Sequence, residues 1–125
     1  MRLLLDTHIY LWWVKNDRQL PKLARTLIME ADEIFISSVS IWEAAIKTKL
    51  GKLDVDIDDL IHAIADSGFR ELSLTAKHAA EICQLPDLYR DPFDRILIAQ
   101  AISEPLKFLT ADSKLQEYSE LVEIV

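Results

Sequence analysis

The sequence predicts an α/β fold built on a parallel β-sheet, and three observations carry this prediction. Short apolar strands alternate with amphipathic helical segments, the first strand lacks the polar alternation of a half-exposed strand, and no internal repeat or linker interrupts the pattern. Strands that alternate with helices form parallel βαβ units, and a strand covered on both faces reads as a continuous apolar run. The 125 residues are expected to form one domain, 1–125.

The element boundaries in the first half of the chain follow from residues that start or stop helices. Pro21 suits a first helical turn, Ser37–Ser40 offer N-terminal caps, and Gly51 suits a C-terminal cap. One face of the helix before Gly51 is apolar and consists of Val39, Trp42, Ile46 and Leu50. The elements expected here are a strand at 2–5, helices at 9–14 and 21–31, a strand at 33–36 and a helix from 38 to 50.

The second half of the chain continues the alternation. A helix with Leu60, Ile61 and Ile64 on its buried face is closed by Gly68, and Thr75 caps a later helix. The expected elements are helix 57–66, strand 69–72, helix 75–82, loop 86–90, helix 91–102 and strands 106–110 and 121–125. The acid-rich run 54–59 lacks the glycine and the final acid of a calcium loop, so it is interpreted as a solvated helix entrance.

Composition excludes several classes of protein. The net charge of −7, from 21 acidic and 14 basic residues, argues against a broad electrostatic grip on nucleic acid, although it allows a local basic rim. The single Cys83 cannot form an internal disulfide, which favours a reducing cytoplasm. No apolar run reaches the ~18 residues of a membrane span, and no signal-peptide pattern opens the sequence.

Several carboxylates are expected to converge at one edge of the sheet. Asp6 follows the first strand, Glu43 lies one turn into the helix after the second strand, and Asp112 follows the fourth; Asp91 and Asp94 lie at the start of another helix. The carboxyl ends of parallel strands are where ligands bind in open α/β sheets. Clustered carboxylates repel one another, and a hard divalent cation such as Mg²⁺ or Mn²⁺ relieves that repulsion.

Each acid also has a purely structural interpretation, and the residues alone leave both open. Asp6 and Asp112 fit as caps of the helices that follow them, and Asp91 fits as a cap before a first-turn proline. Glu43 fits as the partner of Lys47 four residues later on a helix surface. Individually these signals are weak, and their common location is what favours a site.

Four motifs together resemble the PIN-domain family, specifically the VapC-type toxin ribonucleases of type II toxin–antitoxin systems. They are LLLDTH, SSVSIWEAAIKTKLGKL, RDPFDRILIAQA and FLTADSKLQEY, and they extend over nearly the whole chain. The resemblance implies a three-layer α/β/α sandwich with a five-stranded parallel sheet of order 3-2-1-4-5, and a Mg²⁺- or Mn²⁺-dependent ribonuclease. The residues it assigns to the site are an acidic quartet (Asp6, Glu43, Asp94 and Asp112), an additional acid (Asp91), and two threonines that orient ligands or water (Thr7 and Thr110). One departure is Tyr89, where relatives often carry histidine.

The resemblance also implies a reaction and partners. Metal-activated water attacks the RNA phosphodiester in line and leaves a 5′-phosphate and a 3′-hydroxyl. A homodimer and a small cognate antitoxin are implied; an acidic site in an acidic chain favours an antitoxin that inserts a basic residue. The exposed face of helix 9–14, with Tyr10 and two tryptophans, is a candidate docking surface, and core packing is expected for at least one of these rings. The residues considered for a basic rim toward RNA are Lys47, Lys49, Lys52, Arg90 and Arg95.

Two other functions compete with this hypothesis. The first is a phosphohydrolase with an aspartyl nucleophile, which also places Asp after the first strand. That chemistry usually uses a second acid two residues later, where this chain has His8. The second is a non-catalytic binding module in which the acids serve as caps and ion pairs. Stoichiometric Mn²⁺ binding separates such a module from a nuclease.

Overall fold

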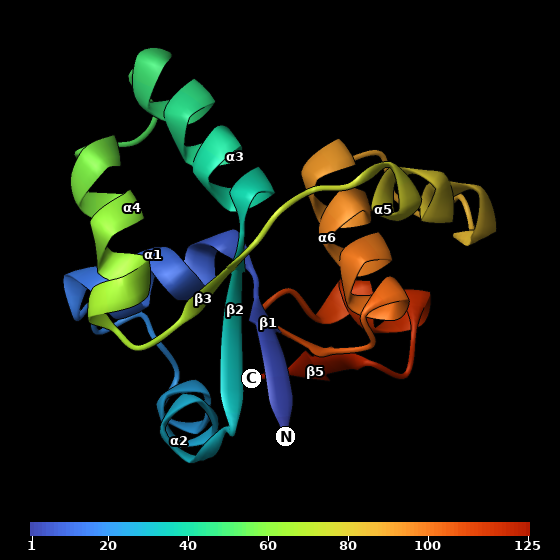
Figure 1. Cartoon of the computed structure of the whole chain (residues 1–125), viewed down its shortest axis with the longest axis horizontal. Helices are drawn as coiled ribbons and strands as arrows, with labels where there is room; N and C mark the ends of the chain where they lie inside the picture. The colour runs from blue at the N-terminus through green and yellow to red at the C-terminus, as the bar shows by residue number, and fades with distance from the viewer.

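A parallel sheet of five strands forms the centre of the computed structural model, which describes all residues from 1 to 125 (Figure 1). The strand order is β3-β2-β1-β4-β5, as predicted, and every neighbouring pair is parallel. The strands are β1 (Arg2–Leu5), β2 (Glu33–Ser37), β3 (Arg70–Leu72), β4 (Lys107–Thr110) and β5 (Val122–Ile124). Strand β1 occupies the central position, where both faces of a strand are covered and an apolar run is required, and its last three residues are buried leucines.

The register of the strands brings three strand ends to the same edge. Leu5 of β1 lies beside Leu109 of β4, and Leu4 lies beside Phe35 of β2. The ladder extends one residue past β1, because the amide of Asp6 donates a hydrogen bond to the carbonyl of Leu109 at 2.9 Å. The residues that follow β1, β2 and β4 therefore start from neighbouring points on the carboxyl edge.

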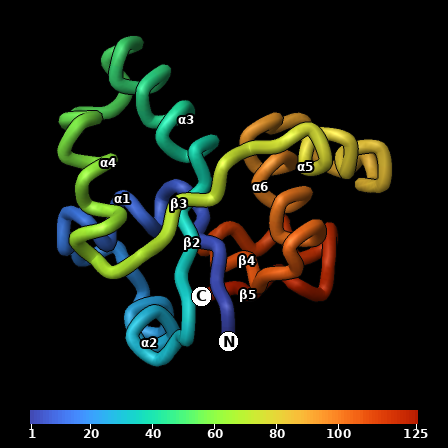
Figure 2. Tube along the Cα trace, in the orientation of Figure 1, coloured from blue at the N-terminus to red at the C-terminus, as the bar shows by residue number.

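Helices cover both faces of the sheet, which gives the predicted three layers (Figures 1 and 2). One face packs against α1, α2 and α4, and the other packs against α6 and the short helix that follows β4. Helix α3 rises directly from β2 at the carboxyl edge, and α5 packs on α6. The bounds are α1 (Thr7–Lys15), α2 (Lys22–Glu30), α3 (Ser38–Lys49), α4 (Ile57–Asp66), α5 (Ala76–Ala80) and α6 (Pro92–Ser103), with 3₁₀ helices η1 (Glu81–Gln84) and η2 (Ser113–Tyr118).

Two hydrophobic cores, one on each side of the sheet, follow from the alternation of side chains along the strands. Leu3 and Leu5 point into the core beneath α1, α2 and α4, whereas Leu4 and Phe108 point into the core beneath α6. All four side chains are completely buried. Burial of one such side chain contributes about 1.5–3 kcal/mol, so the strands are held chiefly by these two cores. No helix is long and apolar enough to cross a membrane.

The structure corrects the expected surface of α1. Tyr10 is completely buried and its hydroxyl donates a hydrogen bond to the carbonyl of Leu60 at 2.6 Å. It therefore cannot form part of a docking surface. Trp13 is half-buried against Phe69, with its indole N–H donated to Ser67. The helix begins at Thr7, directly after Asp6, and this turns Tyr10 toward the core.

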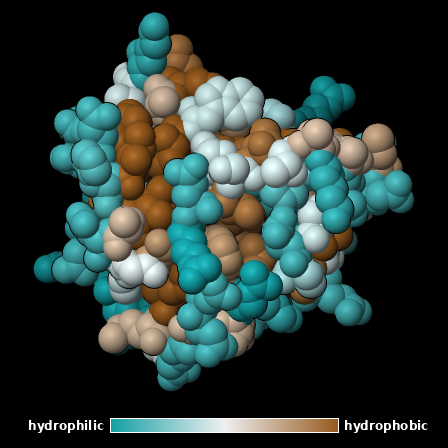
Figure 3. Space-filling view, in the orientation of Figure 1, coloured by the Kyte–Doolittle hydropathy of each residue, from teal (hydrophilic) through white to brown (hydrophobic).

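The apolar face expected on α3 is also largely exposed. Trp42 is 54% exposed and Leu50 64% exposed, while the buried face contains Ser40 and Glu43. On α4, Leu60 and Ile64 are buried as expected, but Ile61 is exposed. Figure 3 shows apolar side chains at the surface between α3 and α4, framed by hydrophilic ones. The buried face of α3 includes these two polar residues because it borders a cavity at the edge of the sheet.

Candidate active site

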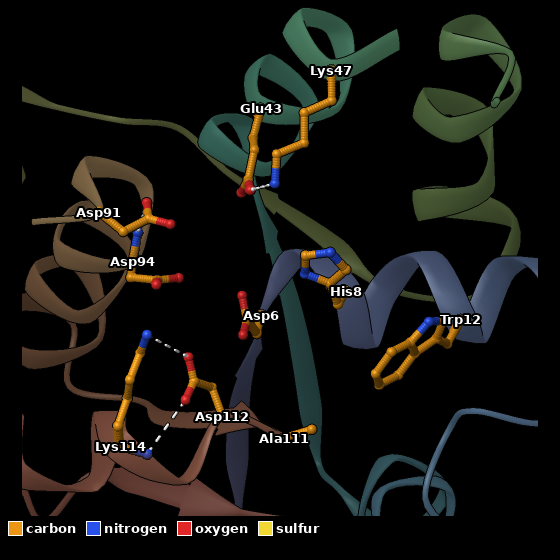
Figure 4. Close-up of a pocket in the computed structure, with 10 residues that line it drawn as sticks. All are labelled: Asp6, His8, Trp12, Glu43, Lys47, Asp91, Asp94, Ala111, Asp112 and Lys114. Carbon is orange, nitrogen blue, oxygen red and sulfur yellow. Dashed lines mark hydrogen bonds and ion pairs between the residues drawn. The ribbon is translucent and has the colours of Figure 1, made fainter. Parts of the chain in front are cut away.

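A cavity of about 380 Å³ lies at the carboxyl edge of the sheet, between α1, α3 and α6 (Figure 4). Its walls carry five carboxylates from four different segments of the chain, together with two lysines and two aromatic rings. The lining residues are Asp6, His8, Trp12, Glu43, Lys47, Asp91, Asp94, Ala111, Asp112 and Lys114. Every acid expected at this edge therefore lines one cavity.

Asp6 is held at the base of this cavity by one donor from strand β4 and one from the start of helix α1. Its Oδ2 accepts a hydrogen bond from the hydroxyl of Thr110 at 2.6 Å, and its Oδ1 accepts one from the amide of Thr7 at 2.7 Å. Asp6 is 8% exposed and Thr110 is completely buried. The second contact makes Asp6 the N-cap of α1. The carboxylate of Asp6 therefore both caps α1 and lines the cavity.

Glu43 approaches from α3 and is fixed by polar neighbours on both oxygens. Oε1 accepts a hydrogen bond from the hydroxyl of Thr7 at 2.8 Å, and that hydroxyl lies 2.9 Å from Oγ of Ser40. Oε2 lies 2.7 Å from Nζ of Lys47. Glu43 is only 4% exposed. The Lys47 pairing is therefore real, but it occurs at the cavity wall and not on a solvated helix face.

Asp91 and Asp94 start α6 and have different surroundings. Asp91 is exposed, and its Oδ1 accepts hydrogen bonds from the amides of Phe93 at 2.9 Å and Asp94 at 3.3 Å. This is the N-cap expected before Pro92. Asp94 is half-buried and points toward Asp6 in Figure 4. Asp91 has a clear structural task at the helix start, whereas Asp94 directs its carboxylate into the cavity.

Asp112 completes the acidic wall and also caps a helix. Its Oδ1 accepts a hydrogen bond from the amide of Lys114 at 3.3 Å, and its Oδ2 lies 3.8 Å from Nζ of the same residue. Its own amide donates to Oγ1 of Thr110 at 3.1 Å. Thr110 thus connects Asp112 to Asp6 through a single hydroxyl.

The carboxylates of the cavity resist simultaneous ionisation. Burial raises the pKa of Asp94 to about 7, and the nearby charges of Asp6, Asp91, Glu43 and Asp112 add to the shift. Burial also raises the pKa of Asp6, although the Thr110 hydrogen bond acts in the opposite direction. For Lys47, burial opposes the charged form, but the hydrogen bond and charge of Glu43 outweigh it and raise the pKa. The site therefore attracts cations.

Three features of the site escape sequence reasoning. Ser40 contacts Thr7 inside the site, and the only hint was its place three residues before Glu43, on the same helix face. Lys114 lines the cavity, and nothing in its local pattern distinguished it. Trp12 lies on the cavity wall, beside the His8 whose position next to Asp6 was expected, whereas the tryptophans were expected at a docking surface.

The basic residues considered for an RNA-binding rim differ in their availability. Arg95 is engaged elsewhere: Nη1 donates to the carbonyl of Pro86 at 2.9 Å, and its guanidinium lies over the ring of Tyr118. These contacts hold the loop that contains Pro86 against the start of α6. Tyr89, the departure from the family pattern, packs edge-on against Tyr118 and lies beneath the Lys114 ammonium. The exposed members of the set are Lys49, Lys52 and Arg90.

Comparison with known proteins adds two kinds of similarity. The family model of the PIN domain matches residues 3–121. Ribonuclease VapC22 from Mycobacterium tuberculosis (strain ATCC 25618 / H37Rv) is 29% identical over 118 residues, which cover 92% of this chain and 90% of that protein.

Solved structures share the fold at lower identity. VapBC2 from Rickettsia felis, bound to a DNA fragment from its promoter, has a TM-score of 0.69 at 18% identity, over 98% of this chain and 96% of that one. DNA-bound VapBC from Salmonella typhimurium has a TM-score of 0.69 at 16% identity, over 100% and 97%. VapC20 from Mycobacterium tuberculosis, a Sarcin-Ricin loop cleaving toxin, has a TM-score of 0.62 at 11% identity, over 94% and 97%.

Proposed function

The chain belongs to the PIN-domain family, and on this premise we propose that it is a metal-dependent endoribonuclease, a toxin neutralised by a cognate antitoxin. The observation that carries the proposal is the convergence of Asp6, Glu43, Asp94 and Asp112 on one cavity at the carboxyl edge of the sheet. The similarity to a ribonuclease over nine-tenths of both chains supports the reaction, and the solved VapBC complexes support the partner.

The carboxylate oxygens of the cavity are the type of ligand that a hard divalent cation prefers. All the acids of the cavity offer oxygen ligands, and their mutual repulsion supplies the electrostatic reason to bind Mg²⁺ or Mn²⁺. As the side chains stand, no three His, Cys, Asp or Glu residues are grouped closely enough to hold an ion. Lys47 and Lys114 instead pair with Glu43 and Asp112. We infer that loading draws the acids together and releases these lysines.

In the proposed hydrolysis, the residues of the cavity either bind the metal or position the residues that bind it. When bound, the metal supplies an activated water and offsets charge on the phosphoryl oxygen. Asp6, Glu43, Asp94 and Asp112 would hold it, and Asp91 contributes at the rim or only as a cap. Thr7 and Thr110 fix the orientations of Glu43 and Asp6 through the hydrogen bonds described above. Water attacks phosphorus as the bond to the 3′-oxygen breaks, which leaves a 5′-phosphate and a 3′-hydroxyl.

The proposed inhibitor is a small basic partner. The acidic cavity suits an inserted arginine, because its planar fork engages two carboxylates at once. Such a side chain would compete with the metal for the same oxygens. Because Tyr10 is buried, it contributes nothing to the apolar contacts of the partner. A homodimer and a location in the cytoplasm complete the proposal.

The direct test is to express the chain alone and sequence the ends of cellular RNA. We expect growth arrest and new 5′-phosphate ends, both suppressed by co-expression of the adjacent antitoxin reading frame. Asp6→Asn should abolish cleavage and keep the fold, and Mn²⁺ should raise the Tm of the wild type by binding the folded state. Full activity in excess chelator contradicts the metal requirement. Absence of both cleavage and Mn²⁺ binding favours a binding module.

A further inference from the structure

One wall of the acidic cavity is aromatic. His8 and Trp12 both line it, with ring centroids 6.1 Å apart and planes tilted by 52°. In Figure 4 the two rings lie on one side of Asp6, and Asp91, Asp94 and Lys114 lie on the other. The cavity thus has an acidic wall and an aromatic wall on opposite sides of Asp6.

The position of these rings follows from the start of α1. Because the helix begins immediately after Asp6, residues 8 and 12 lie one turn apart on the same face, as i and i+4. The intervening residues Ile9, Tyr10 and Leu11 are buried in the core. Trp12 itself is half-buried and packs against that core. Its ring is therefore held in place while part of it stays accessible from the cavity.

The other tryptophans of the chain are differently placed. Trp13 is packed on Phe69, is covered by the guanidinium of Arg25 at 5.6 Å, and borders a separate cavity. Trp42 is exposed on α3, where it meets Phe93 edge-on at 5.0 Å, but it is not among the lining residues. Trp12 alone joins a large π surface to the carboxylates.

We propose that Trp12, flanked by His8, stacks against an unpaired base next to the phosphodiester that is cleaved. This inference rests on the proposed ribonuclease function and specifies its substrate as RNA that is single-stranded at the cleavage site. A base inside a duplex offers no free face, whereas an unstacked base is recognised by stacking on aromatic side chains. A ring fixed by the core loses little conformational freedom on binding, which suits it to this task.

Charge supports a nucleotide over an apolar peptide side chain as the occupant. The carboxylates opposite Trp12 can bind a phosphate only through a bridging cation. Lys47 and Lys114, which line the same cavity, can bind a phosphate directly. A nucleotide places its phosphate and its base in adjacent positions and so matches the two walls at once. An apolar antitoxin residue would use only the Trp12 wall.

The test combines protein variants with abasic substrates. The substrate is a short single-stranded RNA that contains the mapped cleavage site, together with copies that carry one abasic ribose at each flanking position. The proteins are the wild type, Trp12→Leu, Trp12→Phe and the control Trp42→Leu. Loss of one stacking contact lowers kcat/KM by roughly 5- to 100-fold, so we expect this loss, mainly in KM, for Trp12→Leu. Trp12→Phe should recover most of it, and Trp42→Leu should resemble the wild type.

The decisive comparison is between the loss caused by the protein substitution Trp12→Leu and the loss caused by an abasic ribose in the RNA. At the contacted nucleotide, an abasic ribose should cost the wild type about as much as Trp12→Leu costs on intact RNA, and should cost Trp12→Leu nothing further. Independent, multiplicative losses overturn the proposal, as does a wild type that tolerates every abasic position. Unchanged RNA kinetics in Trp12→Leu with weakened antitoxin binding assigns the ring to the inhibitor instead. If Trp12→Leu fails to fold, Trp12→Phe and the abasic series still decide.

The outcome also separates this inference from the function on which it rests. A wild type that cleaves none of the RNAs, in Mg²⁺ or in Mn²⁺, overturns the ribonuclease itself and the stacking site with it. A wild type that cleaves intact RNA but is indifferent to missing bases overturns only the stacking site. Cleavage of a fully duplexed copy at the single-strand rate likewise contradicts the stacking site alone.

Discussion

The hydroxyl of Thr110 donates a hydrogen bond to Oδ2 of Asp6 at 2.6 Å, and it joins the ends of two neighbouring strands at the base of the cavity. The hydroxyl oxygen of Thr110 also accepts a hydrogen bond from the amide of Asp112 at 3.1 Å. One completely buried hydroxyl therefore sets the positions of two of the carboxylates assigned to the site. This makes Thr110 a positioning residue whose contribution is open to measurement.

Thr110→Val should weaken both the fold and the site. Valine has nearly the same shape but leaves Oδ2 of Asp6 and the amide of Asp112 without this partner. Removing a hydrogen bond to a charged group costs on the order of 1.5–3 kcal/mol. We expect a loss of this size in urea unfolding and a lower cleavage rate. Thr110→Ser, which keeps the hydroxyl, is the control; equal rates in the valine and serine variants contradict a positioning role.

The pH dependence of the metal-free protein should reveal Asp94. Its pKa in the folded protein is about 7, above the value of about 3.9 in an unfolded chain. The folded state therefore binds the extra proton between these values, and the free energy of unfolding falls as the pH rises through this window. We expect the wild type to lose more stability than Asp94→Asn between pH 4.5 and pH 7.5, measured with chelator by urea unfolding. Parallel pH profiles for the two proteins would show that Asp94 is already ionised at pH 4.5.

Asp91→Ala should affect stability more than chemistry. The substitution removes the N-cap of α6, which accepts two backbone amides, and loss of such a cap costs about 0.5–2 kcal/mol. Asp91→Asn keeps a capping oxygen and should lie close to the wild type in urea unfolding. Cleavage should fall far less in Asp91→Ala than in Asp94→Asn. An unchanged unfolding midpoint with complete loss of cleavage reverses the two assignments.

Lys47→Met should destabilise the metal-free protein and increase the effect of metal. The substitution leaves the buried carboxylate of Glu43 without its only cationic partner, which is costly. Mn²⁺ would no longer have to displace the ammonium, so the rise in Tm with added Mn²⁺ should exceed that of the wild type. Lys49→Met, on the exposed side of the same helix, is the control. An equal Mn²⁺-induced rise in all three proteins contradicts the exchange of lysine for metal.

Much of the fold was predictable because its signals are local. Strand β1 is a continuous apolar run, and Asp6, Thr75 and Asp91 cap helices where the sequence suggested caps. The strand order came from the family resemblance, not from these signals. Helix α3 shows where local reasoning fails, because its buried face carries Glu43 and Ser40 for the site, whereas the apolar Trp42 and Leu50 lie outside.

The site was predictable in its acids but not in its organisation. Asp6, Glu43 and Asp112 could be placed because each follows a strand, and parallel strands end at one edge. The Glu43–Lys47 pair was foreseen from its spacing of four residues on one helix. The hydroxyl link from Thr7 to Ser40 and the hydrogen bond from Thr110 to Asp6 depend instead on how α3 and β4 are placed beside the end of β1. Such contacts join residues far apart in the sequence, or depend on side-chain directions that no local pattern fixes.

The central place of β1 in the sheet has a consequence for synthesis. Strand β1 is made first, yet one of its two neighbours, β4, is made only near residue 110. Translation proceeds at about 5–20 residues per second, so the nascent chain spends several seconds with that edge of β1 unpaired. During this time Asp6 has neither Thr110 nor Asp112 beside it, and pairings between such distant segments form slowly. The site therefore cannot be assembled until the C-terminal part of the chain, from β4 onward, has been made.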